Sequence, residues 1–334
     1  MLACLIVLLV ATTARGEIKL SPLERYTFAD VSEAKDLSGV IKLTDDLLLV
    51  GSDETIFAET LQRTSATTFA VRERVDLLQE GEIIRDDKGK AVEIDIEGIA
   101  KEGNIVYVIG SHSLKRKKVD EDRSSKSQKK NRKRLAEVVA EPSRHHLIQL
   151  AFDSATSSLK RIGSKNLHGV MAENPYLKLA ATIPSKENGL DIEGIAAKDG
   201  KVYVGFRGPV LRENHVPVAR FEFDKPKEIK MLFINLGGRG IRDMATVQDG
   251  FLIIGGPVGE LGSYVLYYWN GMDAIYGKNN TSKVVSLGEI APPEQAKAEG
   301  LAVISETDST VRIMILYDGI EGGAPEVYEL TKTW

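Results

Sequence analysis

The six-residue string Asp95-Ile96-Glu97-Gly98-Ile99-Ala100 occurs a second time, unchanged, as Asp191-Ile192-Glu193-Gly194-Ile195-Ala196. Each copy is followed by a polar turn and a short apolar strand that ends in glycine, a pattern that predicts a β-hairpin. Weaker copies of this layout precede the apolar runs Leu47–Gly51, Phe251–Gly255 and Val311–Tyr317. Five copies of one hairpin restrict the chain to a repeat architecture.

Two further strand-like runs follow most of these hairpins, as Val216–Asp224 and Glu228–Leu236 do in the third repeat. Four short strands in a unit of about 50 to 60 residues, joined by glycine-rich turns, are typical of a propeller blade. We therefore predict an all-β chain in which residues 17–334 form one five-bladed β-propeller. The last repeat ends before its outer strand. We expect Arg25–Ala29 to supply that strand and close the ring, because closure removes an exposed sheet edge.

Two other folds are compatible with the same pattern. A β-sandwich would require the similarity between the hairpins to be coincidental. A six-bladed propeller would place its extra blade in the 96-residue gap between Glu97 and Glu193. Part of that gap is a polar insertion at residues 114–145, and without the insertion the spacing is close to that of the other repeats.

Residues 1–16 have the form of a signal peptide. A ten-residue apolar run, Leu2–Ala11, precedes a short polar stretch that ends at Gly16, and the run is too short to span a membrane. We expect cleavage before Glu17 and a secreted or periplasmic protein; a frayed apolar N-terminus is the alternative. Cleavage would remove Cys4, the single cysteine, so we expect neither disulfides nor thiolate chemistry. No later stretch is long enough for a transmembrane helix.

Polar residues gather at one end of the predicted hairpins. The first strand of each hairpin begins, and the second ends, on the same face of the disk beside the channel. The beginnings contribute Ser38, Glu97, Glu193, Asp243 and Glu299, with Arg242 beside the fourth. The ends contribute Asp53, His112, Arg207 and Asp318.

This ring has a structural and a functional interpretation. In the structural one, each acid caps the backbone of the next blade, and the arginines pair with the acids. In the functional one, the residues that depart from the repeat are the candidate catalytic residues, namely His112, Arg207 and Arg242. The candidate ligand-binding residues are Asp53, Glu97, Glu193, Asp243, Glu299 and Asp318. Because Ca²⁺ prefers oxygen ligands, the glutamates are also a candidate calcium site, formed by Glu97, Glu193 and Glu299.

The segment Lys115–Arg134 holds eleven lysine and arginine residues against three acids. We predict a mobile loop on the polar face. The loop is either solvated without a binding role or binds a polyanion, such as a phosphate-rich ligand or an acidic polysaccharide. The stretch Asn279-Asn280-Thr281-Ser282 contains glycosylation sequons, which matter only in a eukaryotic cell.

Several motifs resemble those of one bacterial family, domain of unknown function 3616. They are Asp95–Ala100, Asp191–Ala196, Arg207-Gly208-Pro209-Val210, Gly240-Ile241-Arg242-Asp243 and Glu299-Gly300-Leu301. The resemblance spans nearly the whole mature chain. The Glu-Gly-Ile/Leu signature is also similar, more distantly, to the esterase-like relatives of phytase, which are propellers too. These resemblances imply the propeller fold and leave the activity open.

Three functions fit these observations. The first is binding of a small anionic ligand or an envelope polymer on the polar channel face. The second is a metal-assisted esterase or phosphoesterase, in which the glutamates hold Ca²⁺, Arg207 and Arg242 clamp an anion, and His112 is the acid or base. The third is a purely structural scaffold. A net charge of −4 argues against an obligate nucleic-acid binder. The chain has no G-x-S-x-G, P-loop or H-E-x-x-H motif.

Overall fold

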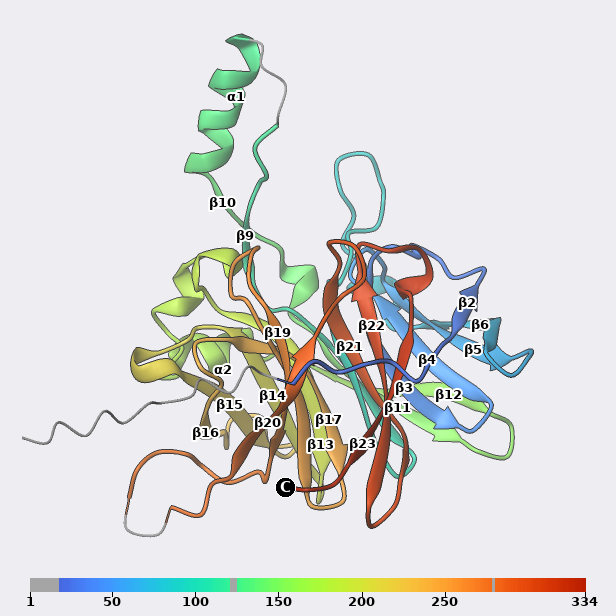
Figure 1. Ribbon diagram of the computed structural model, residues 1–334. Coiled ribbons are helices and arrows are strands. Elements are labelled where there is room, and N and C mark those ends of the chain that lie inside the picture. The colour runs from blue at the N-terminus through green and yellow to red at the C-terminus, as the bar shows by residue number, and fades with distance from the viewer. Residues whose placement is uncertain (1–17, 121–124, 278–279) are drawn as a thin grey trace, which may run out of the picture.

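Five antiparallel sheets surround a single axis in the computed structural model, which describes residues 18–120, 125–277 and 280–334 (Figure 1). The innermost strands of neighbouring sheets contact one another around the axis. The predicted five-bladed β-propeller is therefore confirmed, and the described part of the chain contains no sixth blade. The predicted signal peptide and the expected N-terminus at Glu17 lie outside the described residues.

Each blade runs from an innermost strand beside the axis to an outermost strand at the edge of the disk. The first contains β3 (Leu37–Thr44), β4 (Leu47–Ser52), β5 (Phe57–Arg63) and β6 (Thr68–Asp76). The second contains β7 (Ile96–Glu102), β8 (Ile105–Gly110), β11 (Leu147–Asp153) and β12 (Ser158–Lys165). The third contains β13 (Asp191–Lys198), β14 (Lys201–Gly208), β15 (His215–Phe221) and β16 (Lys230–Asn235). The fourth contains β17 (Gly240–Val247), β18 (Gly250–Gly256), β19 (Tyr264–Trp269) and β20 (Val284–Ile290). The fifth contains β21 (Lys297–Glu306), β22 (Thr310–Asp318), β23 (Glu326–Thr331) and β1 (Glu24–Arg25).

The N-terminal segment, residues 18–29, runs along the outer edges of three blades. Leu20 N donates to Glu289 O of β20 at 2.8 Å. β1 pairs with β23 and supplies the missing outer strand of the last blade, which confirms closure by an N-terminal strand. The predicted bounds of this strand were wrong, because β2 (Thr27–Ala29) leaves the last blade and pairs in parallel with β6 of the first. The segment therefore covers the edges of β20, β23 and β6.

The glycine that follows each repeated glutamate has a packing role. A Cβ added at Gly98 would lie 3.0 Å from Ile195 Cγ2 of the third blade. One added at Gly194 would lie 2.8 Å from Ile241 Cγ2 of the fourth. The Glu-Gly-Ile motif therefore lets an isoleucine of the next blade approach the strand backbone near the channel.

The polar insertion folds differently from our prediction. It begins with β9 (Leu114–Arg116), continues through α1 (Ser125–Ala136) and returns as β10 (Val138–Ala140), which pairs with β9. We call residues 114–140 the basic arm. The arm rises from one face of the disk (Figure 1). Lysine, arginine, glutamine, leucine and alanine favour helix, and α1 contains neither glycine nor proline, so a high charge did not prevent the helix.

A short helix, α2 (His168–Glu173), lies in the connection between the second and third blades. No helix in the described ranges is long and apolar enough to cross a membrane.

Candidate functional site

Every innermost strand carries a β-bulge at its polar end. The extra, unpaired residues of these bulges are Ser38, Glu97, Glu193, Arg242 and Glu299. A bulge re-aims the side chain of the extra residue. The repeat therefore places one serine, three glutamates and one arginine at equivalent positions. Our sequence alignment, which gave the fourth position to Asp243, was wrong by one residue.

Arg242 joins the glutamates on either side of it. Its Nε lies 2.8 Å from Glu193 Oε2, and its Nη2 contacts Glu299. Only 1% of the arginine is exposed, so the charges compensate one another away from water. Arg207 lies 2.6 Å from the other oxygen of Glu193 and also contacts Asp191. Both arginines predicted as catalytic residues are thus held in ion pairs.

Asp243 ties the fourth blade to the fifth. Its Oδ1 accepts a hydrogen bond from Met244 N at 2.7 Å, and its Oδ2 accepts one from Leu301 N at 2.6 Å. The carboxyl is buried and occupies the position that glycine has in the other repeats. This arrangement matches the structural interpretation, in which an acid caps the next blade.

Two other acids have no basic partner among the described residues. Burial, and then the carboxylates of Asp95 and Glu193, raise the pKa of Glu97 well above its usual range. Burial and neighbouring acids raise the pKa of Asp53 to about 8, and its Oδ1 is buried without a hydrogen-bond partner. Both acids belong to the first two blades. On that side the ring therefore holds two carboxyl groups that keep their protons more readily than an exposed acid does.

A cavity of about 810 Å³ opens above the ring; we call it the polar cavity. The acids that line it are Asp36, Asp53, Glu54, Glu93, Asp95, Glu97, Glu187, Asp191, Glu193, Glu299 and Asp318. The bases that line it are Lys115, Arg116, Lys117, Lys118, Arg134, Arg144, Lys186, Arg207 and Lys297. The structure thus brings together five of the six predicted ligand-binding residues and leaves Asp243 outside the lining.

The basic arm forms one side of the polar cavity. Lys115 lies 2.5 Å from Glu141, and Arg116 lies 2.5 Å from Glu187. Lys117 and Lys118 have no acidic partner within the described ranges, and both line the cavity. The side chains at the base of the arm are therefore paired, whereas two further along are free to meet a ligand.

Sequence reasoning missed Arg144, which lines the polar cavity and holds three acids. Its guanidinium lies 2.5 Å from Asp95 Oδ2, 2.7 Å from Glu141 Oε2 and 3.3 Å from Glu93 Oε1. Asp95 and Asp191 open the two identical strings, and both are buried and paired with an arginine. The exact repetition of these aspartates was the signal that could have placed them in the site.

His112 is not in the lining of the polar cavity. Its Nδ1 lies 2.8 Å from Gly110 O, and Leu167 N donates to its Nε2 at 3.4 Å. Burial lowers the pKa of His112 to about 3. Its ring stacks on His145, with the ring centroids 5.6 Å apart. Both ring nitrogens are thus engaged with backbone groups. This geometry does not support a role of His112 as an acid or base, and that role stays a prediction.

The calcium site also stays a prediction. Arg242 contacts two of the three proposed ligands, Glu193 and Glu299. In the part of the chain that the structure describes, no three His, Cys, Asp or Glu side chains are grouped so that they could hold a metal ion.

Fold and site together define a five-bladed β-propeller with a charged cavity at one end of its channel. The chain belongs to the family described as protein of unknown function DUF3616, whose model matches residues 36–323. The more distant resemblance to the esterase-like relatives of phytase has no support in the comparisons. A comparison with curated proteins finds no match.

Solved structures with a similar fold share little sequence with this chain. Hydrazine synthase of Kuenenia stuttgartiensis is 9% identical with a TM-score of 0.40, covering 86% of this chain and 57% of that one. Exo-β-1,3-galactanase from Phanerochaete chrysosporium is 6% identical with a TM-score of 0.45, covering 95% and 64%. A hypothetical protein from Leishmania major is 13% identical with a TM-score of 0.44, covering 95% and 90%. This chain spans less than two thirds of the first two proteins, and likenesses this low carry no argument about activity.

Proposed function

We propose that the protein is an exported, non-catalytic binding module that takes an anionic ligand or an envelope polymer at the rim of the polar cavity. The observation that carries the proposal is the separation of charge in this cavity. Lys117 and Lys118 on the basic arm lack acidic partners among the described residues, whereas Arg207 and Arg242 are neutralised by acids. Free cations on an exposed arm attract anions.

This separation of charge favours a binding site at the rim of the polar cavity, rather than at the acids and arginines of the ring that we first considered. An anion at the floor of the cavity would meet Asp53 and Glu97, which have no basic partner within the described ranges and whose raised pKa values show that negative charge is disfavoured there. Burial away from water makes an added negative charge at the floor costly. At the rim, by contrast, an anion meets the ammonium groups of the arm. A cavity of about 810 Å³ is large enough for a small ligand or for one unit of a polymer.

Removing the arm tests the proposal. Arg116 and Val138 are partners across β9 and β10, so residues 117–137 can be replaced by Asn-Gly, the dipeptide that closes two-residue hairpins. Binding of labelled polyphosphate and polygalacturonate would be measured by fluorescence anisotropy over a series of salt concentrations. We expect the shortened protein to bind at least about tenfold more weakly, with a flatter dependence on salt. Unchanged affinity and unchanged salt dependence would overturn the proposal.

A milder pair of variants separates charge from folding of the arm. The double substitution K117Q/K118Q removes two unpaired charges and leaves α1 in place. The matched control, K227Q/K230Q, removes two exposed lysines at the outer edge of the third blade. The first pair should weaken binding and the control should not. Equal losses in both would indicate a response to net charge alone.

A hydrolase is the second candidate, and the uncompensated acids favour it. With a pKa of about 8, Asp53 holds a proton at neutral pH and could act as a general acid toward an ester or phosphoester. The test is a panel of carboxylate and phosphate esters with EDTA or with added Ca²⁺, using D53N and E97Q as controls. Turnover by the wild type that neither variant retains would support catalysis. Turnover that both variants keep would exclude these acids.

A further inference from the structure

The far end of the channel holds a second pocket, which we call the far-pole pocket. Its volume is about 180 Å³, and side chains from all five innermost strands line it. Ile99, Ile195 and Leu301 each follow a bulged glutamate by two residues, so the strands run from the polar cavity into an aliphatic wall. For comparison, an engineered apolar cavity of about 150 Å³ takes up benzene. The far-pole pocket can therefore hold a ligand of a few carbon atoms.

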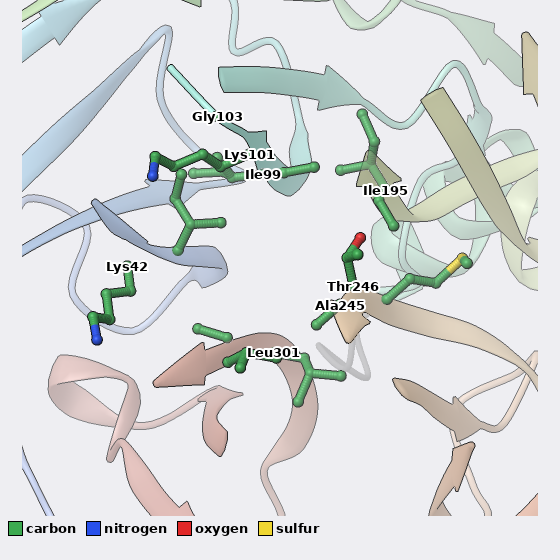
Figure 2. Close-up of a pocket in the computed structure, with 14 residues that line it drawn as sticks. Lys42, Ile99, Lys101, Gly103, Ile195, Ala245, Thr246 and Leu301 are labelled. Carbon is green, nitrogen blue, oxygen red and sulfur yellow. The ribbon is translucent and has the colours of Figure 1, made fainter. Parts of the chain in front are cut away.

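Among the described residues, two lysines are the charged residues of this pocket and no acid is part of its lining. Figure 2 shows Lys42 and Lys101 on one side of the pocket, with their ammonium groups apart from each other at its outer edge and with Ile195, Ala245 and Leu301 across from them. Lys42 donates to Ile304 O at 2.5 Å and pairs with Asp45. Lys101 is different, because within the described ranges it has neither an ion pair nor a hydrogen bond. Its ammonium lies 5.9 Å from the centroid of the Phe152 ring.

The other blade junctions at this end show what Lys101 lacks. Charged side chains join the remaining blades by bonding to backbone groups of a neighbouring blade. The bridges are Lys42 to Ile304 O, Glu102 to Gly200 N, Lys198 to Gln248 O, and Glu306 to Gln248 N. Between β3 and β7 the described residues contain no such bridge, although Arg72 of β6 donates to Thr156 O of the second blade at 3.3 Å farther from the axis. Lys101 lies on β7 at that junction, and within the described ranges its ammonium has no ion-pair or hydrogen-bond partner.

We propose that the far-pole pocket binds a short aliphatic carboxylate, with the carboxylate group at Lys101 and the alkyl chain against the aliphatic wall. A charge-assisted hydrogen bond to the Lys101 ammonium would supply the counter-ion that this side chain lacks among the described residues. Burial, and then repulsion from Lys42, lower the pKa of Lys101, which indicates that the unliganded site disfavours this charge. A doubly charged phosphate fits less well, because an apolar wall does not replace its hydration.

Calorimetric titration of the full protein tests both the charged and the apolar contact of the proposal. The ligands are acetate, butanoate, 1-butanol and inorganic phosphate. Butanoate should bind at least about tenfold more tightly than 1-butanol, because the alcohol lacks the charge. Butanoate should also bind more tightly than acetate, by about fourfold for each buried CH₂ group. Equal binding of butanoate and 1-butanol, or tighter binding of phosphate, would overturn the proposal.

Three substitutions locate the site. K101M should weaken butanoate binding at least about tenfold, and K101R should preserve it. K230M, which removes an exposed lysine from β16, should bind butanoate as the wild type does. A melting temperature for each variant confirms that it is folded. Wild-type affinity in a folded K101M would refute the assignment. The shortened-arm protein should retain butanoate binding, so failure at the rim and failure at this pocket can be told apart.

Discussion

Replacing Asp53 by asparagine should stabilise the propeller, and the gain should grow as the pH rises. Burial, and then the nearby carboxylates of Asp95 and Asp318, raise the pKa of Asp53 from 3.8 to about 8 in the folded protein. The folded state therefore keeps a proton that the unfolded chain releases as the pH passes 3.8. The wild type loses stability across that window, whereas a neutral asparagine does not titrate.

The difference between the two pKa values of Asp53 sets the magnitude of the gain. A difference of about four pH units corresponds to about 6 kcal/mol at the alkaline limit, with a slope of about 1.4 kcal/mol per pH unit inside the window. Water in the polar cavity screens part of the repulsion between the carboxylates, which reduces this free-energy difference. We expect D53N to gain about 2 to 4 kcal/mol relative to the wild type between pH 5 and pH 8.

Urea denaturation at pH 5, 6, 7 and 8 measures the free energy of unfolding of both proteins. Asp153→Asn is the matched control. Hydrogen bonds from Thr156 and Ala155 lower the pKa of Asp153 below 3.8, so it titrates below this pH range. The difference between D153N and the wild type should stay constant. A constant difference for D53N as well, or an NMR titration that places Asp53 below pH 5, would refute the reasoning.

Three shorter predictions concern the fold. Arg242→Met should lower the free energy of unfolding by about 3 to 5 kcal/mol, because buried Glu299 loses its ion pair and buried Glu193 loses one of its two arginine partners; a loss under about 1 kcal/mol would contradict the ion-pair account. Deleting residues 18–29 should raise the average mass measured by light scattering, because open strand edges pair between molecules; an unchanged mass would show that the edges are protected otherwise. Gly194→Ala should cost about 1 to 3 kcal/mol, since its Cβ would lie 2.8 Å from Ile241 Cγ2. Gly169→Ala, in open space, is the control and should cost nothing measurable.

The blades were predictable because one local structure recurs in each of them. A bulged polar residue, a glycine and an apolar residue follow one another at the start of four of the five innermost strands, and the sequence shows this order directly in Glu97–Ile99 and Glu193–Ile195. The small residue is needed wherever the next blade approaches the backbone. Because this packing requirement is met by adjacent residues of one strand, it can be recognised in the local sequence.

The fourth repeat was misaligned because we matched its aspartate with the glutamates of the other repeats by charge. Asp243 resembles the glutamates, yet Met244 is the counterpart of Ile99 and Ile195, and Arg242 takes the bulge. Aligning the buried apolar residue would have given the correct register, because packing against the next blade fixes that residue more strictly than the polar one. The resulting arginine, rather than a fourth acid, changes the electrostatics of the whole ring.

The pairing of the charges could not be predicted from the sequence. Arg144 reaches Asp95 across 49 residues, and Arg242 reaches Glu299 across 57. Which acids lack a partner depends on these long-range contacts. The path of the N-terminal segment is a similar case, since residues 27–29 pair with a strand of the first blade that no local pattern indicates.

Both unsatisfied sets of charges lie at the junction of the first and second blades. At the polar end, Asp53 and Glu97 lack basic partners among the described residues, while the rest of the ring is neutralised by Arg207 and Arg242. At the far end, Lys101 has no ion pair or hydrogen bond within the described ranges, whereas the innermost strands of the other junctions are bridged. The basic arm is inserted in the second blade. If selection acted only on the closure of the ring, the innermost strands of this junction would be bridged like those of the others. The exceptions at both ends of the channel, acids at one and an ammonium group at the other, are what binding sites on a shared axis would require.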